Sequence, residues 1–237
     1  MSDLSTQLNR KGFVRAIQKS SAPLRRQVLD ELRQSIISGR LEPGARLVER
    51  ELVAMMGVSR TVIREALRQM ESEGLIIIVP NKGPIVRKLS IGEARDLYSI
   101  RAVLEGLAAR RFVETGDKEH IEMLQRYLEE TAMAYSTNDP ARILETKNRF
   151  YDTLFEGAGS EALSSMISLL HMRIWRWRAV GLSHPHRNPE RWIESIANLR
   201  TLLVAIRKRD ADLAERTLRD EVQKASAEVL RLLADGV

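Results

Sequence analysis

Hydrophobic residues in the first third of the chain change from a helical to a strand-like spacing. Across residues 23–39 apolar side chains recur every three to four positions, which predicts one amphipathic helix. Residues 47–75 hold two shorter amphipathic stretches on either side of Gly57, which predicts two helices joined by a tight turn. Two β-rich runs, residues 75–79 and 85–87, then flank a Pro- and Gly-containing segment typical of a hairpin. We expect the inward-facing helical residues to be Leu24, Val28, Leu32, Ile36, Leu52, Met55, Val62, Ala66, Leu67 and Met70.

From Ser90 onward the apolar period stays near 3.6 residues and strand signals disappear. Breaks near positions 116, 139, 158, 185 and 209 divide this part into about six helices with short connections, which predicts an antiparallel bundle. The fold class is therefore mainly α: a winged helix-turn-helix with a two-stranded wing, followed by an all-α bundle. We expect a basic arm over residues 1–21, the winged helix over 22–89 and the bundle over 90–237.

The start of the second helix of the helix-turn-helix carries the first candidate chemistry. Ser59 can cap this helix, and Arg60, Thr61 and Arg64 face outward, with Arg68 one turn further on. Arginine can offer two parallel donors to guanine in the major groove, and hydroxyl groups can bind phosphate. The alternative is that these arginines form only the solvated side of an amphipathic helix. The preceding helix and the following hairpin favour DNA binding.

The charge distribution agrees with a DNA-binding N-terminal part. Residues 1–90 hold 16 Lys and Arg against 9 Asp and Glu, whereas the remaining residues are nearly balanced. The chain contains no cysteine, which excludes disulfides, thiol nucleophiles and Cys-ligated zinc. No apolar run is long enough to span a membrane and no signal-peptide core precedes the helices, so we expect a cytoplasmic protein.

Three charged residues fall on the apolar stripes of the bundle. Arg101 lies among Leu97, Leu104 and Ala108 in the first bundle helix. Lys147 lies on the stripe of Ile143, Phe150 and Leu154, and Glu221 on that of Ala214, Leu218, Ala225 and Leu232. A charge facing a core is costly unless it is paired or hydrated, so three of them predict an internal polar cavity. The alternatives are that the long side chains reach the rim of the bundle, or that the stripes are misphased by one residue.

Several short segments of the N-terminal part carry a family resemblance: residues 36–41, 43–44, 49–52, 57–60, 64–67 and 73–76, with Leu47 and Val62. They resemble the winged-helix domain of the GntR family of bacterial transcription regulators, most closely its FadR-type branch. The resemblance implies a homodimer that binds a short palindromic operator. The residues implied to contact double-stranded DNA are Arg50, Ser59, Arg60, Thr61, Arg64, Lys82 and Gly83.

Residues 91–110 and 205–222 resemble the FCD domain, the helical ligand-binding module of FadR-type regulators. Many FCD domains hold a divalent metal with one aspartate and three histidines. Matching the motifs, the corresponding positions here are Lys147, Tyr151, Leu199 and Glu221, of which Glu221 alone could be a metal ligand. We therefore predict no metal and no other cofactor.

A ligand-responsive regulator is the function that these observations predict. We expect Lys147 and Glu221 to face each other, with Arg101 and Tyr151 on the same cavity wall and Arg178 near it. Such a cavity could bind a small-molecule effector, for example a carboxylate. The resemblance implies a repressor. The alternative is a constitutive dimeric DNA-binding protein whose bundle only dimerises.

An enzyme is a weak alternative, and the remaining histidines offer no catalytic residue. A helical metal-dependent hydrolase would need the ligand set that is missing here. His184 and His186 fall in a loop bounded by Gly and Pro without an acidic third ligand. His120 and His171 look isolated, with no serine or carboxylate pattern beside them.

Overall fold

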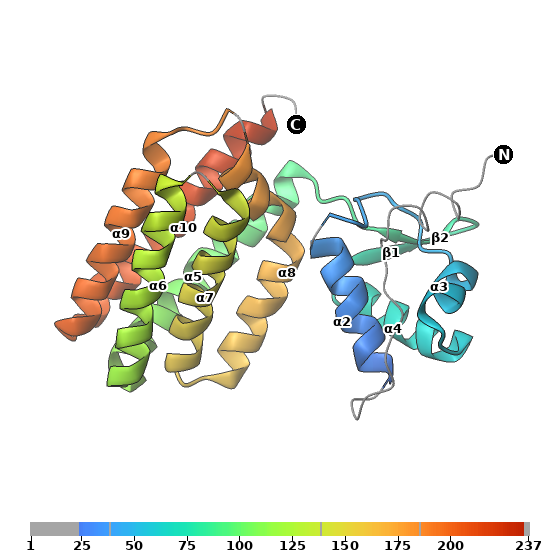
Figure 1. Cartoon of the computed structure of the whole chain (residues 1–237), viewed down its shortest axis with the longest axis horizontal. Coiled ribbons are helices and arrows are strands. Elements are labelled where there is room, and N and C mark those ends of the chain that lie inside the picture. The colour runs from blue at the N-terminus through green and yellow to red at the C-terminus, as the bar shows by residue number, and fades with distance from the viewer. Residues whose placement is uncertain (1–23, 38, 138, 185, 235–237) are drawn as a thin grey trace. The chain divides into compact units, whose positions relative to one another are not determined.

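The computed structural model describes residues 24–37, 39–137, 139–184 and 186–234, and the predicted arm over residues 1–21 lies outside them. The chain divides into two compact units, and the boundary lies between Leu89 and Ser90. Most of the described residues are helical (Figure 1).

The N-terminal unit is a winged helix-turn-helix, and its caps explain where the helices begin and end. Gly57 closes the first helix of the motif in a left-handed conformation, with φ of 66°. Ser59 opens the next helix, because its side-chain oxygen accepts a hydrogen bond from the backbone N–H of Val62. The elements are α2 (Leu24–Ile37), α3 (Glu49–Met56), α4 (Arg60–Ser72), β1 (Ile76–Val79) and β2 (Gly83–Val86).

The wing is a two-stranded antiparallel sheet. Ile76 pairs with Val86 and Val79 pairs with Gly83, so the turn occupies residues 80–82. Ile76 and Val86 are buried against the helices, whereas Ile77 and Ile78 are exposed. Strand β2 begins at Gly83, two residues earlier than the sequence pattern predicts, because ladder hydrogen bonds do not require an apolar residue at each position.

The packing of the N-terminal unit corrects three predicted core positions. Met56 is 1% exposed and Ile63 is fully buried, whereas the predicted Met55 and Val62 are only partly buried. Leu24, the first residue of α2, is 36% exposed. Helix α3 has only two turns, so its few apolar residues do not define the buried face to within one position. Val28 and Leu32 of α2 and Ala66 and Met70 of α4 are fully buried, and these predictions are confirmed.

The C-terminal unit is an all-helical bundle, and most of its helices begin at a polar cap. Ser90 and Glu93 form a reciprocal capping box at the start of the first bundle helix. Asp117 and Asp139 cap the next two helices with their side chains. The helices in the described part of this unit are α5 (Ile91–Thr115), α6 (Lys118–Ser136), α7 (Pro140–Gly157), α8 (Glu161–Ser183), α9 (Glu190–Arg207) and α10 (Ala211–Ala234).

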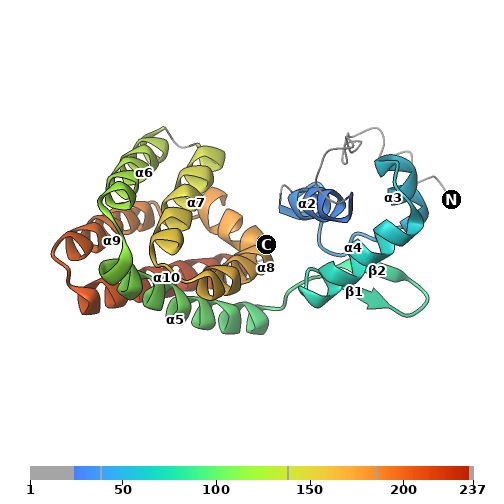
Figure 2. The same cartoon turned by 90° about the horizontal axis from the view of Figure 1, so that it is seen from below.

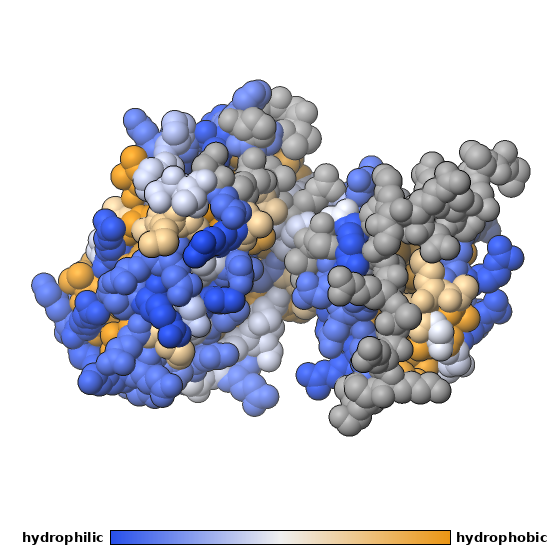
Figure 3. All heavy atoms as spheres, viewed as in Figure 1, coloured by the Kyte–Doolittle hydropathy of each residue, from blue (hydrophilic) through white to orange (hydrophobic). Residues whose placement is uncertain are grey.

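Helices α5 and α10 run side by side and form the longest contact in the bundle (Figures 1 and 2). Phe112, Phe150 and Leu154 are fully buried at the centre of one core shared by the bundle helices. The face of the bundle seen in Figure 3 is covered mainly by hydrophilic side chains. None of the described helices is both long and apolar enough to cross a membrane.

Candidate functional site

The predicted DNA-reading surface is exposed in the N-terminal unit. Arg60 and Arg64 lie on the outer face of α4, with side chains that are 61% and 56% exposed. Thr61 and Arg50 are also exposed, and Ser59 is held at the cap of α4. Because the apolar face of the same helix is buried, this polar face is presented as a unit at the N-terminus of α4.

Both arginines of this face interact with Glu49, which sequence reasoning did not single out. The Arg64 Nε–H group donates to both carboxylate oxygens of Glu49, at 2.9 and 3.1 Å. Arg60 Nε lies 3.9 Å from the same carboxylate. This contact uses the Nε–H donor, and the guanidinium carries four further N–H donors on its terminal nitrogens. Glu49 therefore orients these arginines from the neighbouring helix.

The tip of the wing offers a second exposed basic surface. Asn81 and Gly83 both adopt positive φ, at 62° and 81°, which turns the chain sharply around the exposed Lys82. No atom lies within 4 Å of the position that a Cβ would occupy on Gly83, so its backbone is open to a ligand. Lys82 and Gly83 can therefore approach a phosphate or a groove edge together.

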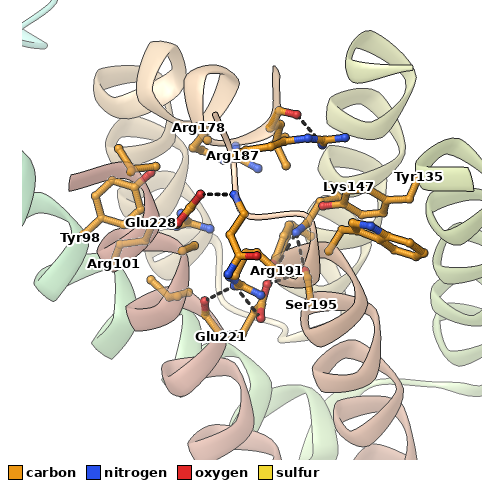
Figure 4. A pocket seen from close by; sticks show the side chains of 18 residues that line it. Tyr98, Arg101, Tyr135, Lys147, Arg178, Arg187, Arg191, Ser195, Glu221 and Glu228 are labelled. Atoms are coloured by element: carbon orange, nitrogen blue, oxygen red, sulfur yellow. Dashed lines mark hydrogen bonds and ion pairs between the residues drawn. The ribbon is translucent and has the colours of Figure 1, made fainter. Parts of the chain in front are cut away.

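The bundle contains a cavity lined by residues from all six of its described helices, α5 to α10 (Figure 4). All five residues predicted for an effector site line it, although they come from four different helices. They are Arg101, Lys147, Tyr151, Arg178 and Glu221. Tyr98, Tyr135, Trp192 and Val222 are among the other lining residues, so the cavity wall combines cations, aromatic rings and aliphatic groups.

One side of the cavity is formed by a group that we call the Lys147 cluster: Lys147, Arg191, Ser195, Asn198 and Glu221. Lys147 Nζ donates to Ser195 Oγ at 2.8 Å, and Ser195 Oγ donates to Glu221 Oε1 at 2.6 Å. Lys147 Nζ lies 3.6 Å from the same carboxylate oxygen, so the two residues face each other. Arg191 and Asn198 reach the other oxygen of Glu221, at 2.9 and 2.8 Å.

The groups of the Lys147 cluster remain charged in spite of their burial. Burial alone raises the pKa of Glu221, but the nearby charges of Lys147 and Arg191 outweigh it and lower the pKa below the ordinary value. Burial alone lowers the pKa of Lys147, but the acidic groups of Tyr135, Tyr151 and Glu221 raise it above the ordinary value. The cluster therefore holds two cations and one carboxylate at neutral pH.

A second group, the Arg178 cluster, consists of Arg101, Glu105, His171 and Arg178. Arg101 binds Glu105 with two hydrogen bonds, at 2.5 and 3.3 Å. His171 Nε2 lies 2.5 Å from Glu105 Oε1, and Arg178 lies 3.2 Å from His171 Nδ1. Because arginine can only donate, His171 Nδ1 accepts and His171 Nε2 carries the proton. The imidazole is therefore neutral and connects Arg178 to Glu105 by hydrogen bonds.

Burial determines the protonation states of the Arg178 cluster. Desolvation and the charge of Arg178 lower the pKa of His171 to about 4, so the imidazole is neutral at pH 7. Burial opposes ionisation of Glu105, but the charge of Arg101 and the hydrogen bonds from His171 and Arg101 lower its pKa to about 2. Desolvation and the charge of Arg101 lower the pKa of Arg178 from its ordinary value.

Tyr151 lies between the two clusters. Its ring centre is 5.9 Å from the guanidinium carbon of Arg101 and 6.0 Å from that of Arg178, and Lys147 is one turn away on α7. The residue is 2% exposed, and burial raises the pKa of its phenol to about 12. Tyr151 is thus a neutral phenol on the cavity wall.

Sequence reasoning missed Glu105, Arg191 and His171, and the view of His171 as isolated was wrong. Glu105 follows Arg101 by four residues, and this i,i+4 charge pair was the available signal. His171 contacts two residues that are distant in sequence, so no local pattern could reveal its role. His184 and His186 lie at the loop between α8 and α9, as predicted.

Each of the two units matches a known family. Residues 24–86 match the family described as bacterial regulatory proteins, gntR family, and residues 96–224 match the FCD domain. This chain belongs to the GntR family. It is an FCD-containing, DNA-binding transcription regulator, as its sequence motifs indicated, and its relatives are regulators and not enzymes.

GntR-family relatives match along most of this chain. The HTH-type transcriptional repressor RspR of Escherichia coli is 27% identical and covers 89% of this chain and 90% of its own. The uncharacterized regulator YdhC of Bacillus subtilis is 28% identical over 68% of this chain and 72% of its own. The solved structure of Escherichia coli McbR/YncC is similar with a TM-score of 0.74 and 26% identity, over 89% of this chain and 98% of that one.

The residues at the metal position that the FCD resemblance implies do not fit a divalent ion. The Lys147 ammonium is hydrogen-bonded at this position and carries a positive charge, which repels a metal. Leu199 is buried in the apolar core, and Tyr151 is a neutral phenol. Glu221 has an oxygen to offer, but its oxygens already accept hydrogen bonds from Ser195 and Asn198.

Proposed function

We propose that this GntR-family protein is a repressor whose operator affinity is controlled by a small organic anion bound in the bundle cavity. The observation that carries the proposal is the cavity itself, where buried cations outnumber buried carboxylates. A buried excess of positive charge is costly, and a bound anion removes that cost. The repressor direction is supported by similarity to RspR, which is described as a repressor.

The DNA-binding part of the proposal rests on α4 and the wing. Arg60, Arg64 and Arg50 would contact base edges in the major groove of double-stranded DNA, with Ser59 and Thr61 binding phosphate. Lys82 and Gly83 would approach the backbone or the adjacent groove from the wing. The exposure of this face, with its apolar counterpart buried, supports the assignment.

A homodimer would let two such helices read a short palindromic operator, and the outer face of α5 supports one. Ile100, Val103 and Leu107 are 49%, 50% and 41% exposed and share one face of the helix. Asp96 lies before this apolar stripe and Arg111 follows it. If a second copy packs antiparallel about the point between Val103 and Leu104, Ile100 meets Leu107 and Asp96 meets Arg111 of the other copy. The stripe is therefore self-complementary in both shape and charge.

Effector control favours one dimer geometry over another, because a ligand with equal affinity for both would shift nothing. A constitutive dimer has no use for buried cations without matching carboxylates, since an apolar core would be less costly. The unequal pairing of charges in the cavity therefore favours ligand sensing over the constitutive alternative.

Operator selection from genomic fragments, followed by footprinting, tests the DNA-binding part directly. We expect the full-length protein to protect one short palindromic sequence. A metabolite panel in a thermal-shift assay then tests sensing, because a ligand of the folded state raises the melting temperature. A compound that raises it and weakens operator binding supports the proposal. A broad panel without any effect would favour the constitutive alternative.

A further inference from the structure

The cavity carries two separate positive charges in excess, one at each cluster. In the Arg178 cluster the carboxylate of Glu105 pairs with Arg101, whereas Arg178 contacts only the neutral imidazole of His171. In the Lys147 cluster one ammonium and one guanidinium share the carboxylate of Glu221. Glu228 also lines the cavity, but its carboxylate is paired with Arg231 at 2.9 Å. Glu194 also approaches Arg191, at 3.7 Å, but it is 43% exposed and binds Lys224 more closely, at 2.6 Å.

The excess charge in the Arg178 cluster sits on Arg178. Arg101 is bound by Glu105 through two hydrogen bonds, whereas Arg178 donates to an uncharged imidazole nitrogen. Among the described residues no carboxylate forms an ion pair with Arg178, and the exposed Asp152 acts on it only through longer-range electrostatic attraction. A carboxylate from outside would therefore complete Arg178 without displacing an internal partner.

The excess charge on the other side comes from Arg191. Its Nε and one terminal nitrogen are buried without a hydrogen-bond partner in the described part of the chain, although another terminal nitrogen contacts Glu221. An unsatisfied buried donor is costly, and a ligand oxygen would satisfy it. Arg178 lines the cavity from α8 and Arg191 from α9, as Figure 4 shows.

The wall between the two clusters offers a third contact. The Tyr151 hydroxyl lines the cavity and has no hydrogen-bond partner among the described residues, although the residue is 2% exposed. Electrostatic interactions of its phenol extend to Lys147 and Glu221 on one side and to Glu105 and Arg101 on the other. The neutral Tyr151 hydroxyl thus lies between two positively charged clusters. This arrangement suits an elongated ligand with an anionic group at each end.

We propose that the effector is a small dicarboxylate that spans the cavity, with one carboxylate at Arg178, the other at Arg191 and Lys147, and Tyr151 donating to it between them. This inference rests on the proposed function and names its ligand class. The cavity has a volume of about 70 Å³, and a single buried water needs roughly 10–15 Å³, so a short chain fits. Val222 and Val229 supply an apolar surface for its methylene groups.

Isothermal titration calorimetry of the full-length protein with length-matched acids tests the proposal. The probes are succinate and glutarate, the monocarboxylates butyrate and pentanoate, and inorganic phosphate as a dianion with a single centre. We expect each dicarboxylate to bind at least about tenfold more tightly than its matched monocarboxylate, because it gains one charge-assisted contact. Phosphate reaches only one cluster, so we expect it to bind more weakly than either dicarboxylate.

Two variants locate the contacts. Arg178→Met should reduce dicarboxylate affinity to that of the matched monocarboxylate, and Tyr151→Phe should reduce it on the order of tenfold by removing one donor to a charged group. Arg200→Met is the matched control, because Arg200 is exposed on α9 and does not line the cavity. Circular dichroism confirms that each variant is folded before titration.

Equal binding of mono- and dicarboxylates, tighter binding of phosphate, or no binding of any dicarboxylate would overturn the dicarboxylate assignment. Failure of this inference is distinguishable from failure of the proposed function. If a compound of another class binds and releases the operator, the ligand class is wrong and the sensing function stands. If no genomic fragment is protected, the DNA-binding function fails whatever the titrations give.

Discussion

Glu49 holds Arg64 in place on the proposed DNA-binding face: Arg64 Nε lies 2.9 Å from one oxygen of the Glu49 carboxylate. The two residues come from the two helices of the helix-turn-helix, so the contact fixes one helix relative to the side chains of the other. The carboxylate also repels phosphate, which limits non-specific attraction to DNA. Orientation and repulsion both favour the correct sequence over other sequences.

Removal of this carboxylate should weaken selectivity more than affinity. We expect Glu49→Gln to raise binding to non-specific DNA and to lower the ratio of specific to non-specific affinity by on the order of 1 kcal/mol, because Arg64 loses its orientation. Fluorescence anisotropy with operator and scrambled duplexes measures both affinities. Glu65→Gln is the control, since Glu65 is exposed on the same helix α4. An unchanged ratio of specific to non-specific affinity would show that Glu49 does not contribute to selectivity.

Replacement of Arg60 or Arg64 by alanine should cost about 1–3 kcal/mol of specific binding, because each removes a predicted base contact, and it should leave the fold intact.

Lys82→Ala should instead weaken binding to all sequences alike, because Lys82 is expected to bind phosphate. It should reduce the slope of log affinity against log salt concentration by about one. Operator titrations at several salt concentrations separate the two effects. If Arg60→Ala binds the operator as well as the parent does, α4 is not in the groove.

Charge placed in the apolar stripe of α5 should dissociate the proposed dimer. We expect Val103→Glu to weaken self-association by more than about 2 kcal/mol, because the residue would lie at the centre of the interface. Operator affinity should fall with it, since each monomer contacts only half of the palindrome. Sedimentation velocity measures the oligomeric state. Ile193→Glu is the control, because Ile193 is also apolar and exposed but lies on α9. A parent protein that is monomeric in solution would contradict the proposed dimer.

Acid should destabilise the bundle in two steps. The pKa of His171 is lowered to about 4 from an ordinary 6.5, so between these values the unfolded chain binds a proton that the folded chain excludes. The free energy of unfolding should therefore fall by on the order of 2 kcal/mol between pH 7 and 5. Glu105, with a pKa lowered to about 2 from 4.5, should add a second loss below pH 4.5.

Denaturant unfolding at pH 7 and pH 5 checks the first step. His171→Gln keeps a polar side chain at this position but cannot be protonated in this range, so its stability should change less between the two pH values. Equal losses in the variant and the parent would assign the pH dependence to other groups.

Metal removal should have no effect on the bundle. The resemblance places Lys147 where the family has a metal-binding aspartate, and its ammonium is paired with Glu221, so we expect no change in melting temperature on dialysis against EDTA and no stoichiometric transition metal by elemental analysis. A tightly bound metal in equimolar amount would contradict the assignment of Lys147 and Glu221 as partners.

The order of the helices and several cavity residues could be predicted from the sequence because the bundle helices are long. Helices α7 and α10 have long apolar stripes, so the phase of each stripe is well defined and a charge within it is recognisable. Lys147 and Glu221 were found in this way, and they lie 3.6 Å apart. Glu105 was not found, because its burial depends on partners from its own helix and from α8.

The remaining differences between the predicted and the observed structure come from short helices and from contacts between residues that are distant in the sequence. In α3 two turns cannot distinguish Met55 from Met56 as the buried residue. The contacts between Glu49 and Arg64 and between Arg178 and His171 join residues whose proximity depends on tertiary packing. Sequence spacing carries no information on such pairs unless they share a helix face.

Operator affinity, measured by fluorescence anisotropy while the bundle cavity is filled with a ligand that calorimetry has verified, tests the central claim most directly. The account predicts at least a tenfold fall in affinity as the ligand saturates, and a matching fall in ligand affinity when operator is present, because coupling between sites is reciprocal. An operator affinity that stays constant while the cavity fills would contradict control of DNA binding by the bundle.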